Sequence, residues 1–396
     1  MPEYMILRNL ATPRTASGFE RFGPAATVAA PTPPEPRVET RDLSLRDALN
    51  ATRESDVAAV AMPMPIRLVR PLESAVGAAA PGDAWGIAAV KADTSPMTGD
   101  GVVVAVLDTG IDKAHPAFAG VTIVENDFSG SGNGDRQGHG SHCAGTIFGR
   151  DVDGRRIGIA RGVKKALIGK VLGDDGSGSS DMIFRGIQWA LDEGAHVISM
   201  SLGFDFPGMV RQMEQAGLPT EPAVSRALEA YRSNLRFFDA LMQMVRARAA
   251  FLDTAVVVAA TGNESERRGA RPYTIAASLP AASEGIVSVA ALGQGQGGTL
   301  DIAPFSNTMA QVAAPGVDIL SVRVGGGLRA LSGTSMACPH VAGVAALWWQ
   351  ALRSSGALRA SAGLVISNIL AHARTDGLAP GLDTEDYGAG IVTAPQ

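Results

Sequence analysis

The sequence predicts an α/β fold, with a mainly parallel sheet covered by helices on both faces and a small α+β region before it. Short, almost continuously apolar runs, typical of buried parallel strands, alternate with stretches of helical periodicity. The 396-residue chain also contains 47 glycines, which suits tight turns between strands and helices. The expected strands are 102–107, 166–172, 197–202, 255–260 and 286–291, and helices are expected after His139, over 180–193 and from Ser335.

Composition and charge argue against several classes of partner. Apolar residues make up 46% of the chain and charged residues 18%, and the formal net charge is -5 without a long basic run. This balance does not favour nucleic acid or an anionic membrane as a partner. The longest apolar stretches, 102–107 and 341–349, are much shorter than the ~18–20 residues that cross a bilayer, so membrane insertion is not expected.

The N-terminus and the cysteines bear on the compartment. Residues 1–10 lack a basic start followed by an apolar core, so we expect no signal peptide. The two cysteines, Cys143 and Cys338, are compatible with a reducing compartment, and a disulfide between them stays open because it depends on their separation. The protein is therefore expected to be cytoplasmic, or exported by a route without a recognisable signal peptide.

Two regions are expected, an N-terminal region over 1–78 and a larger domain over 79–396. A Pro/Ala-rich stretch near 25–36 predicts an extended linker within the first region. The small residues between Glu73 and Asp83 form the kind of segment that proteases cut. Around the linker we expect a strand over 4–10, a helix over 43–53 and a strand over 56–62.

An aspartate, a histidine and a serine occur in that order, each at a place suited to catalysis. Asp108 directly follows an apolar run, which places it at the C-terminal edge of the sheet. His139 lies in a Gly-His-Gly turn that leads into a helix, and Ser335 opens an apolar helix. A serine hydroxyl is a weak nucleophile unless a base takes its proton and nearby donors stabilise the oxyanion, so these residues predict nucleophilic catalysis. From the pattern alone, Asp112 and His142 are alternatives to the first two.

The blocks around these residues, A-V-L-D-T-G, H-G-S-H-C-A-G and G-T-S-M-A-C-P-H-V-A-G, resemble those of the subtilisin-like serine proteases, or subtilases. The resemblance extends from about Trp85 to the C-terminus. It implies a subtilisin-like fold and a serine endopeptidase that hydrolyses peptide bonds through an acyl-enzyme. It also assigns the roles: Asp108 orients the imidazole, His139 acts as the general base and Ser335 attacks.

The resemblance implies further residues of the site. Asn263 and the backbone N–H of Ser335 form the oxyanion hole, whereas His142 and His340 are structural. The substrate is expected to bind as an added strand, because main-chain hydrogen bonds are then available whatever its side chains are. The candidate substrate-binding residues are Leu172, Gly176, Ser177, Gly178, Ser201, Leu202, Gly203, Ala260 and Gly262.

The N-terminal strand, helix and strand resemble the inhibitory pro-segment of the family. The resemblance implies a zymogen whose own N-terminal segment is an intramolecular inhibitor, removed by autoprocessing between about Glu73 and Trp85. An accessory domain that is never removed is the alternative. The chain departs from the family in a helical insertion near 204–253, with a long amphipathic helix over 222–251. This insertion either narrows the cleft as a lid or thickens the surface of the fold.

No cofactor is required for this chemistry, and the sequence does not identify a metal ligand set. Structural calcium is common in the family, but the acidic turns 151–154 and 174–176 lack a full set of ligands, so solvated turns are the favoured interpretation. The expected partner is a protein or peptide substrate. Two other functions remain open: a subtilase-related acyl transferase or peptide ligase, in which an amine resolves the acyl-enzyme, and a catalytically inactive binding module on the same fold.

Overall fold

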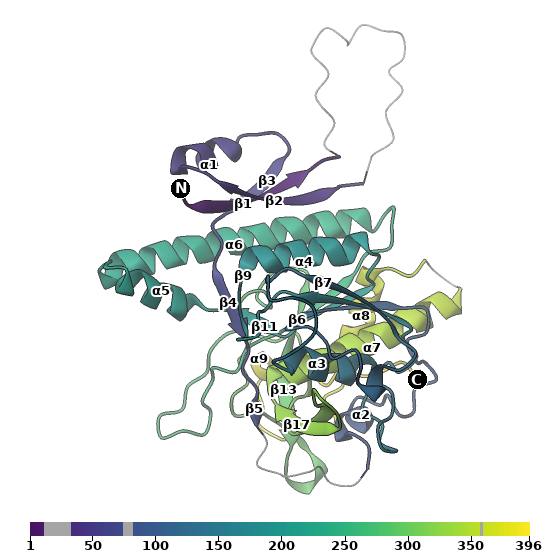
Figure 1. The fold of residues 1–396 in the computed structure, drawn as a ribbon. Helices are drawn as coiled ribbons and strands as arrows, with labels where there is room; N and C mark the ends of the chain where they lie inside the picture. The colour runs from purple at the N-terminus through teal and green to yellow at the C-terminus, as the bar shows by residue number, and fades with distance from the viewer. Residues whose placement is uncertain (12–32, 74–81, 357–358) are drawn as a thin grey trace, which may run out of the picture.

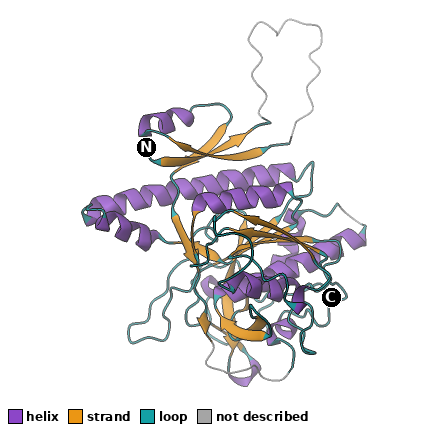
Figure 2. Cartoon of the chain, viewed as in Figure 1, coloured by secondary structure: helices purple, strands orange, loops and turns teal. Residues whose placement is uncertain are grey.

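The computed structural model describes residues 1–11, 33–73, 82–356 and 359–396 (Figures 1 and 2). Its centre is an eight-stranded sheet in the order β14-β13-β12-β10-β6-β8-β7, with β15 also paired to β13. Every pair is parallel except β13 with β14, which confirms the predicted fold class. The strands are β6 (Val103–Asp108), β7 (Thr122–Asp127), β8 (Lys165–Lys170), β10 (Val197–Met200), β12 (Val256–Ala260), β13 (Ile286–Gln294), β14 (Leu300–Ile302) and β15 (Val312–Pro315).

Helices cover both faces of this sheet. Along β6, Val104 and Val106 belong to one apolar core, whereas Ala105 and Leu107 belong to a second core on the opposite face. Because both faces are covered, the strands are apolar throughout rather than alternately polar. The first core includes residues of α2 (Trp85–Ala89), α3 (His139–Phe148), α7 (Thr334–Ser355) and α8 (Ala362–Ala371), and the second includes residues of α4 (Ser180–Asp192) and α6 (Thr220–Arg248).

The described residues of the N-terminal region form a small subdomain with an antiparallel sheet in the order β2-β1-β3 and one helix. Its elements are β1 (Glu3–Asn9), β2 (Pro36–Asp42), α1 (Leu45–Ala51) and β3 (Val57–Ala61). The predicted strands and helix agree with β1, β3 and α1 to within two residues, whereas β2, a charged strand that begins with proline, was not predicted. Most of the linker expected near 25–36 lies outside the described residues.

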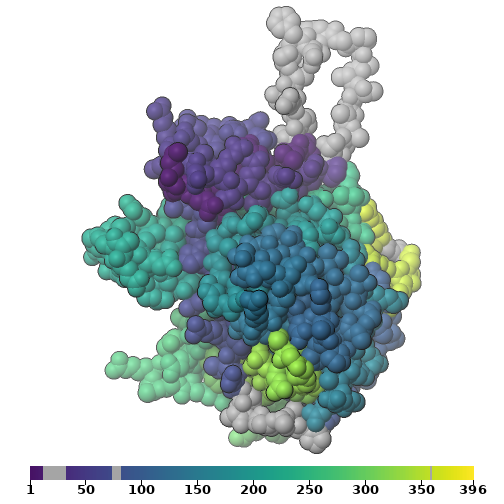
Figure 3. Space-filling model, in the orientation of Figure 1, coloured from purple at the N-terminus to yellow at the C-terminus, as the bar shows by residue number. Residues whose placement is uncertain are grey.

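The helical insertion, α5 (Phe206–Gln215) and α6, supports this subdomain. One side of α6 faces the core, where the rings of Phe237 and Phe238 lie 4.3 and 4.4 Å from that of Phe184. From α6, Asn234 Nδ2 also donates to the carbonyl oxygen of Met62 at 2.8 Å, just after β3. Figure 3 shows the purple subdomain seated on the teal helical layer. The insertion is therefore more than surface thickening: it is the platform that carries the N-terminal subdomain.

Short strands lead from the subdomain into the larger domain. The strand β4 (Pro65–Leu68) lies between β9 (Ser177–Ser179) and β11 (Leu202–Phe204) and is antiparallel to both. The chain then enters β5 (Leu72–Glu73), which pairs with β17 (Leu328–Ser332), itself paired with β16 (Ile319–Val322). The remaining short helices are η2 (Pro116–Phe118), η3 (Gln296–Gly298) and α9 (Thr384–Tyr387). No helix in the described ranges is both long and apolar enough to cross a bilayer.

Candidate active site

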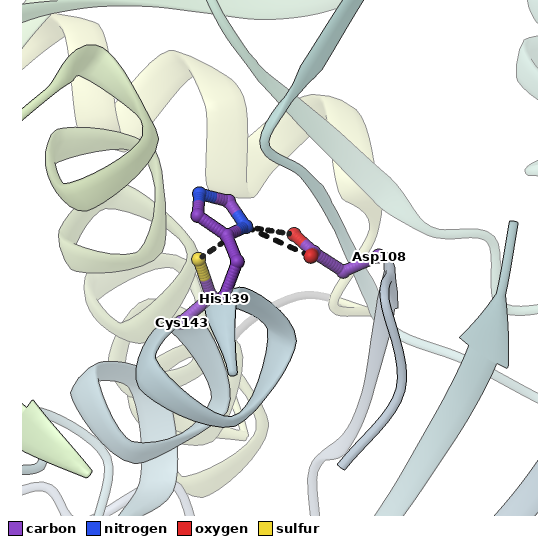
Figure 4. Close-up of side chains that lie close together, drawn as sticks. All are labelled: Asp108, His139 and Cys143. Atoms are coloured by element: carbon purple, nitrogen blue, oxygen red, sulfur yellow. Dashed lines mark hydrogen bonds and ion pairs between the residues drawn. The ribbon is translucent and has the colours of Figure 1, made fainter. Parts of the chain in front are cut away.

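The end of β6 and the start of α3 bring Asp108 and His139 together (Figure 4). Nδ1 of His139 lies 2.8 Å from Oδ1 and 3.0 Å from Oδ2 of Asp108, and both side chains are fully buried. A carboxylate in this place accepts the Nδ1 proton of a neutral imidazole and leaves Nε2 as the basic nitrogen. Within the described part of the chain, Nε2 is buried without a hydrogen-bond partner.

Asp112 and His142, the alternatives to Asp108 and His139, have other partners, and so does His340. His142 Nε2 is 3.0 Å from the carbonyl oxygen of Ile319, and burial lowers the pKa of His142 to about 3. Nδ1 of His340 lies 2.8 Å from the carbonyl oxygen four residues earlier in α7, and burial lowers its pKa to about 4. The Asp112 carboxylate accepts the backbone N–H of Gly325 instead of an imidazole N–H.

A buried carboxylate that sequence reasoning missed holds the start of α3. Asp135 accepts the backbone N–H of Gly138 at 2.7 Å and the hydroxyl of Thr109 at 3.0 Å. Its other oxygen accepts both the N–H and the hydroxyl of Ser141, at 2.9 and 2.7 Å. A negative charge is favoured at a helix N-terminus. Asp135 therefore fixes the turn from which the His139 side chain projects.

Ser335 is the second residue of α7 and is fully buried. Its hydroxyl donates to the carbonyl oxygen of Val69 at 3.0 Å, and the carbonyl oxygen of Ser201 lies 3.4 Å away. The hydroxyl makes no hydrogen bond to Nε2 of His139. The structure thus brings Ser335 to the cleft that holds the N-terminal segment, with its proton directed at that segment rather than at the imidazole.

The Asn263 side chain follows β12 and reaches the same segment. Its Nδ2 donates to the carbonyl oxygen of Arg70 at 3.0 Å. Its Oδ1 accepts the backbone N–H of Thr334 at 2.8 Å and the Thr334 hydroxyl at 2.9 Å. These two bonds fix the orientation of the amide, so that Nδ2 faces the cleft. Thr334 is therefore part of the site.

Residues 65–69 run through the cleft, and residues 65–68 pair through the main chain with strands on both sides. Six candidate substrate-binding residues border this path: Gly176, Ser177 and Gly178 on one side, Leu202 and Gly203 on the other, and Ser201 beside Ser335. The other three have bonds or packing within the larger domain. Leu172 and Ala260 are buried in its cores, and the N–H of Gly262 donates to the Thr334 hydroxyl at 3.2 Å.

Both cysteines are free thiols buried beside the site. Sγ of Cys143 lies 3.8 Å from Nδ1 of His139 and donates to the carbonyl oxygen of Ser335 at 3.4 Å (Figure 4). Burial raises the pKa of both thiols, that of Cys338 to about 11. Asp108, His139 and Cys143 converge, but a thiol that burial keeps protonated is a poor metal ligand. The trio fits an imidazole held by a carboxylate and packed against a thiol better than it fits a metal centre.

The acidic turn 174–176 does not fit a calcium ion. The two oxygens of Asp174 lie 2.6 Å from Nζ of Lys170 and 3.1 Å from the guanidinium of Arg136. Asp175 accepts the Ser177 hydroxyl at 2.8 Å. The Lys170 ammonium also donates to two backbone carbonyls, so a protein cation already occupies the place that these oxygens could offer to a metal.

Comparison with known proteins places the chain in a family. The family model described as "Subtilase family" matches residues 99–390. Proteinase R from Parengyodontium album is 33% identical over 275 residues, which are 66% of this chain and 59% of that protein. M-protease from Shouchella clausii (strain KSM-K16) is 33% identical over 78% of this chain and 68% of its own length. Thermitase from Thermoactinomyces vulgaris is 34% identical over 66% of this chain and 80% of its own length.

The match extends over most of this chain but not over all of each relative. Besides 59% of proteinase R, the chain spans 52% of the thermophilic serine proteinase of Bacillus sp. (strain AK1). The matched residues 99–390 contain the four residues that the motifs selected, Asp108, His139, Asn263 and Ser335. The parallel sheet on which these residues lie agrees with the match. The chain belongs to the subtilase family.

Proposed function

We propose that this protein is a serine endopeptidase that hydrolyses peptide bonds through an acyl-enzyme at Ser335. The observation that carries the proposal is the path of residues 65–70. The cleft holds these residues as an added strand, with successive carbonyl oxygens on Ser335 and Asn263. The buried pair of Asp108 and His139 supplies a base.

In the proposed reaction, Nε2 of His139 takes the hydroxyl proton of Ser335 as its oxygen attacks the substrate carbonyl carbon. Asp108 stabilises the imidazolium that forms. Asn263 Nδ2 donates to the oxyanion, and His139 then gives its proton to the leaving amine. A water molecule, activated by the same imidazole, resolves the acyl-enzyme. The reaction needs no cofactor.

We also propose that the N-terminal segment is an intramolecular inhibitor of this site. The Ser335 hydroxyl contacts the carbonyl of Val69, whereas the Asn263 amide contacts the next carbonyl, that of Arg70. Because the Ser335 proton is directed at the Val69 carbonyl and not at Nε2 of His139, the hydroxyl is not activated for attack on the Arg70 carbonyl that Asn263 holds. Ser335 must also turn towards His139 before it can react. A bound but unreactive strand thus blocks the cleft.

Fluorophosphonate labelling of the full chain tests the endopeptidase proposal. In the fraction of molecules whose cleft is open, the wild type is expected to take one label, at Ser335, and to hydrolyse casein, and Ser335→Ala is expected to lose both properties. His139→Ala is expected to lose hydrolysis almost as completely, because the residues act as a unit. Hydrolysis that persists in Ser335→Ala would overturn the assignment of the nucleophile. A wild type that neither takes the label nor hydrolyses peptides would favour a binding module.

A further inference from the structure

Arg67 of β4 lies against two carboxylates of the larger domain. Its guanidinium is 3.4 Å from Oδ1 of Asp205 and 3.5 Å from Oε1 of Glu264. The side chains are 42% exposed for Arg67, 18% for Asp205 and 40% for Glu264, so the ion pairs lie at the edge of the cleft rather than in free solvent. A cation on the strand that fills the cleft thus meets an acidic pair on the cleft wall.

Both carboxylates also interact with groups other than Arg67. Asp205 is the N-cap of α5, and its Oδ1 accepts a backbone N–H in the first turn at 2.9 Å. Oε2 of Glu264 accepts Nδ2 of Asn307 at 2.8 Å, which leaves Oε1 for a cation. Arg211 of α5 lies 3.9 Å from Oδ1 of Asp205 and is a second cation beside this carboxylate. The insertion therefore contributes both a carboxylate and a competing guanidinium to this end of the cleft.

The main chain fixes where the Arg67 side chain can go. Arg67 pairs with Gly203 on one side and Ser177 on the other, so its backbone has a set register. The side chains before and after it, Ile66 and Leu68, are only 1% and 4% exposed and belong to the second apolar core. At three successive positions, 66 to 68, the cleft thus binds an apolar, a basic and an apolar side chain.

We propose that Asp205 and Glu264 form a specificity site that selects a basic side chain in the peptide substrate, flanked by apolar residues. The selected position is the one that Arg67 occupies, two residues before Val69. This inference rests on the proposed function, because it takes the N-terminal strand as the counterpart of a substrate. Glu264 directly follows Asn263, so one member of the acidic pair lies on the same segment of chain as the oxyanion donor.

Peptides with the sequence of residues 64–73, carrying alanine in place of Pro71, test the specificity site on the full-length protein. Arginine, glutamine or glutamate stands at the position of Arg67, and kcat/KM is measured for each. We expect the arginine peptide to be cleaved about threefold to tenfold better than the glutamine peptide, which is the range for two partly exposed ion pairs, and the glutamate peptide to be the poorest. The ratio between two peptides is independent of self-inhibition, because both compete for the same open fraction of enzyme.

The double variant Asp205→Asn/Glu264→Gln is expected to bring the arginine-to-glutamine ratio close to one. Asparagine still caps a helix and glutamine still accepts from Asn307, so the fold is kept. The matched control, Glu229→Gln/Glu284→Gln, removes two exposed carboxylates that pair with arginines of α6, and should keep the wild-type ratio.

Protection of Ser335 from fluorophosphonate by the same peptides gives a second readout that needs no turnover. The arginine peptide should protect at a lower concentration than the glutamine peptide in the wild type, but not in the acidic-pair variant. Equal ratios in wild type and variant would overturn the specificity site and leave the endopeptidase proposal intact. No label and no cleavage at all would instead reject the endopeptidase proposal, and the inference with it.

Discussion

At the scale of single residues, Thr334 determines which way the Asn263 amide faces. Its hydroxyl donates to Oδ1 of Asn263 and accepts the N–H of Gly262. Thr334→Val keeps the shape but removes both bonds, and we expect kcat for peptide hydrolysis to fall about fivefold to tenfold, in line with about 1 kcal/mol for a net hydrogen bond. KM should change little, because the oxyanion contact strengthens only in the transition state.

Two further variants set the scale for the effect of Thr334→Val on kcat. Asn263→Ala removes the donor itself and should lower kcat by more, about 10²–10³-fold. Ser332→Ala is the matched control, because its hydroxyl lies two residues earlier, at the end of β17, but bonds to Asp318. A Thr334→Val enzyme with the kcat of the wild type would mean that the backbone N–H of Thr334 alone orients the amide.

The thiol of Cys143 gives a second prediction at this scale. It touches both His139 and the backbone of Ser335, so a bulky group on its sulfur has to displace one of them. We expect an organomercurial to inactivate the enzyme slowly, since the thiol is buried and its pKa is raised. Cys143→Ala should keep hydrolysis and resist the reagent, and Cys338→Ala should give partial relief. Full activity in a protein whose mass shows both thiols modified would contradict this.

The residues that could be located from the sequence share one property: each ends or closely follows an apolar strand, or opens a helix. Asp108, His139, Asn263 and Ser335 are of this kind. Asp135 and Thr334 could not be given their roles, because those roles consist of bonds to residues distant in the chain. Thr334 meets Asn263 71 positions away, and Asp135 meets Thr109 26 positions away. No local pattern signals such pairs.

At the scale of elements, Pro71 is expected to keep the strand in the cleft intact. It follows Arg70, whose carbonyl oxygen accepts from Asn263. Proline has no N–H, and its ring both restricts the preceding residue and crowds the nitrogen that His139 would have to protonate. We therefore expect the Pro71→Ala chain to cut itself near this point faster than the wild type. Intact mass over time measures the rate and identifies the bond.

The Pro71→Ala/Ser335→Ala double variant is the control and should stay full length. The sequence alone predicts processing between about Glu73 and Trp85, but residues 74–81 lie outside the described structure, and the carbonyls at the site belong to Val69 and Arg70. If Pro71→Ala remained uncut while hydrolysing an added peptide, the register of the strand rather than the proline would be what protects it.

The periodicity of the sequence does not predict the strands that build the cleft, for a physical reason. The strands β4, β9 and β11 are three or four residues long, and β4 begins at a proline. Their stability comes from pairing between segments more than 100 residues apart, such as Ile66 with Gly178. The long helix α6 was predicted from its own periodicity over 222–251, but its role was not, because the subdomain it carries comes from the start of the chain.

At the scale of the whole molecule, the proposed inhibition rests on several weak contacts across one interface. The N-terminal subdomain rests on α4 and α6, where Gln188 accepts the N–H of Val38 and Asn234 donates to Met62. The segment that follows pairs with β9 and β11 and ends on β17. One short segment of chain joins the contacts of the subdomain to those of the strand in the cleft. Weakening the contacts of the subdomain with α4 and α6 should therefore open the cleft.

The last prediction concerns acid and the whole fold. Burial lowers the pKa of His142 to about 3 and those of His196 and His340 to about 4, whereas an unfolded chain binds these protons near pH 6.5. Below pH 6.5 the unfolded state therefore binds more protons than the native state, and the free energy of unfolding falls as the pH drops towards 4. For His340 alone the loss is about 2 to 3 kcal/mol at pH 4.5.

Urea unfolding of the Ser335→Ala protein at pH 7.5 and 4.5 measures this loss without self-digestion. Adding His340→Asn keeps a donor near the helix carbonyl that His340 contacts and removes the titration, so the difference between the two pH values should shrink by about 2 kcal/mol. His372→Gln, at an exposed histidine, is the control and should leave the difference unchanged. If His340→Asn kept the full acid sensitivity, protonation of His340 could not be a cause of acid unfolding, and the loss would have to come from other groups.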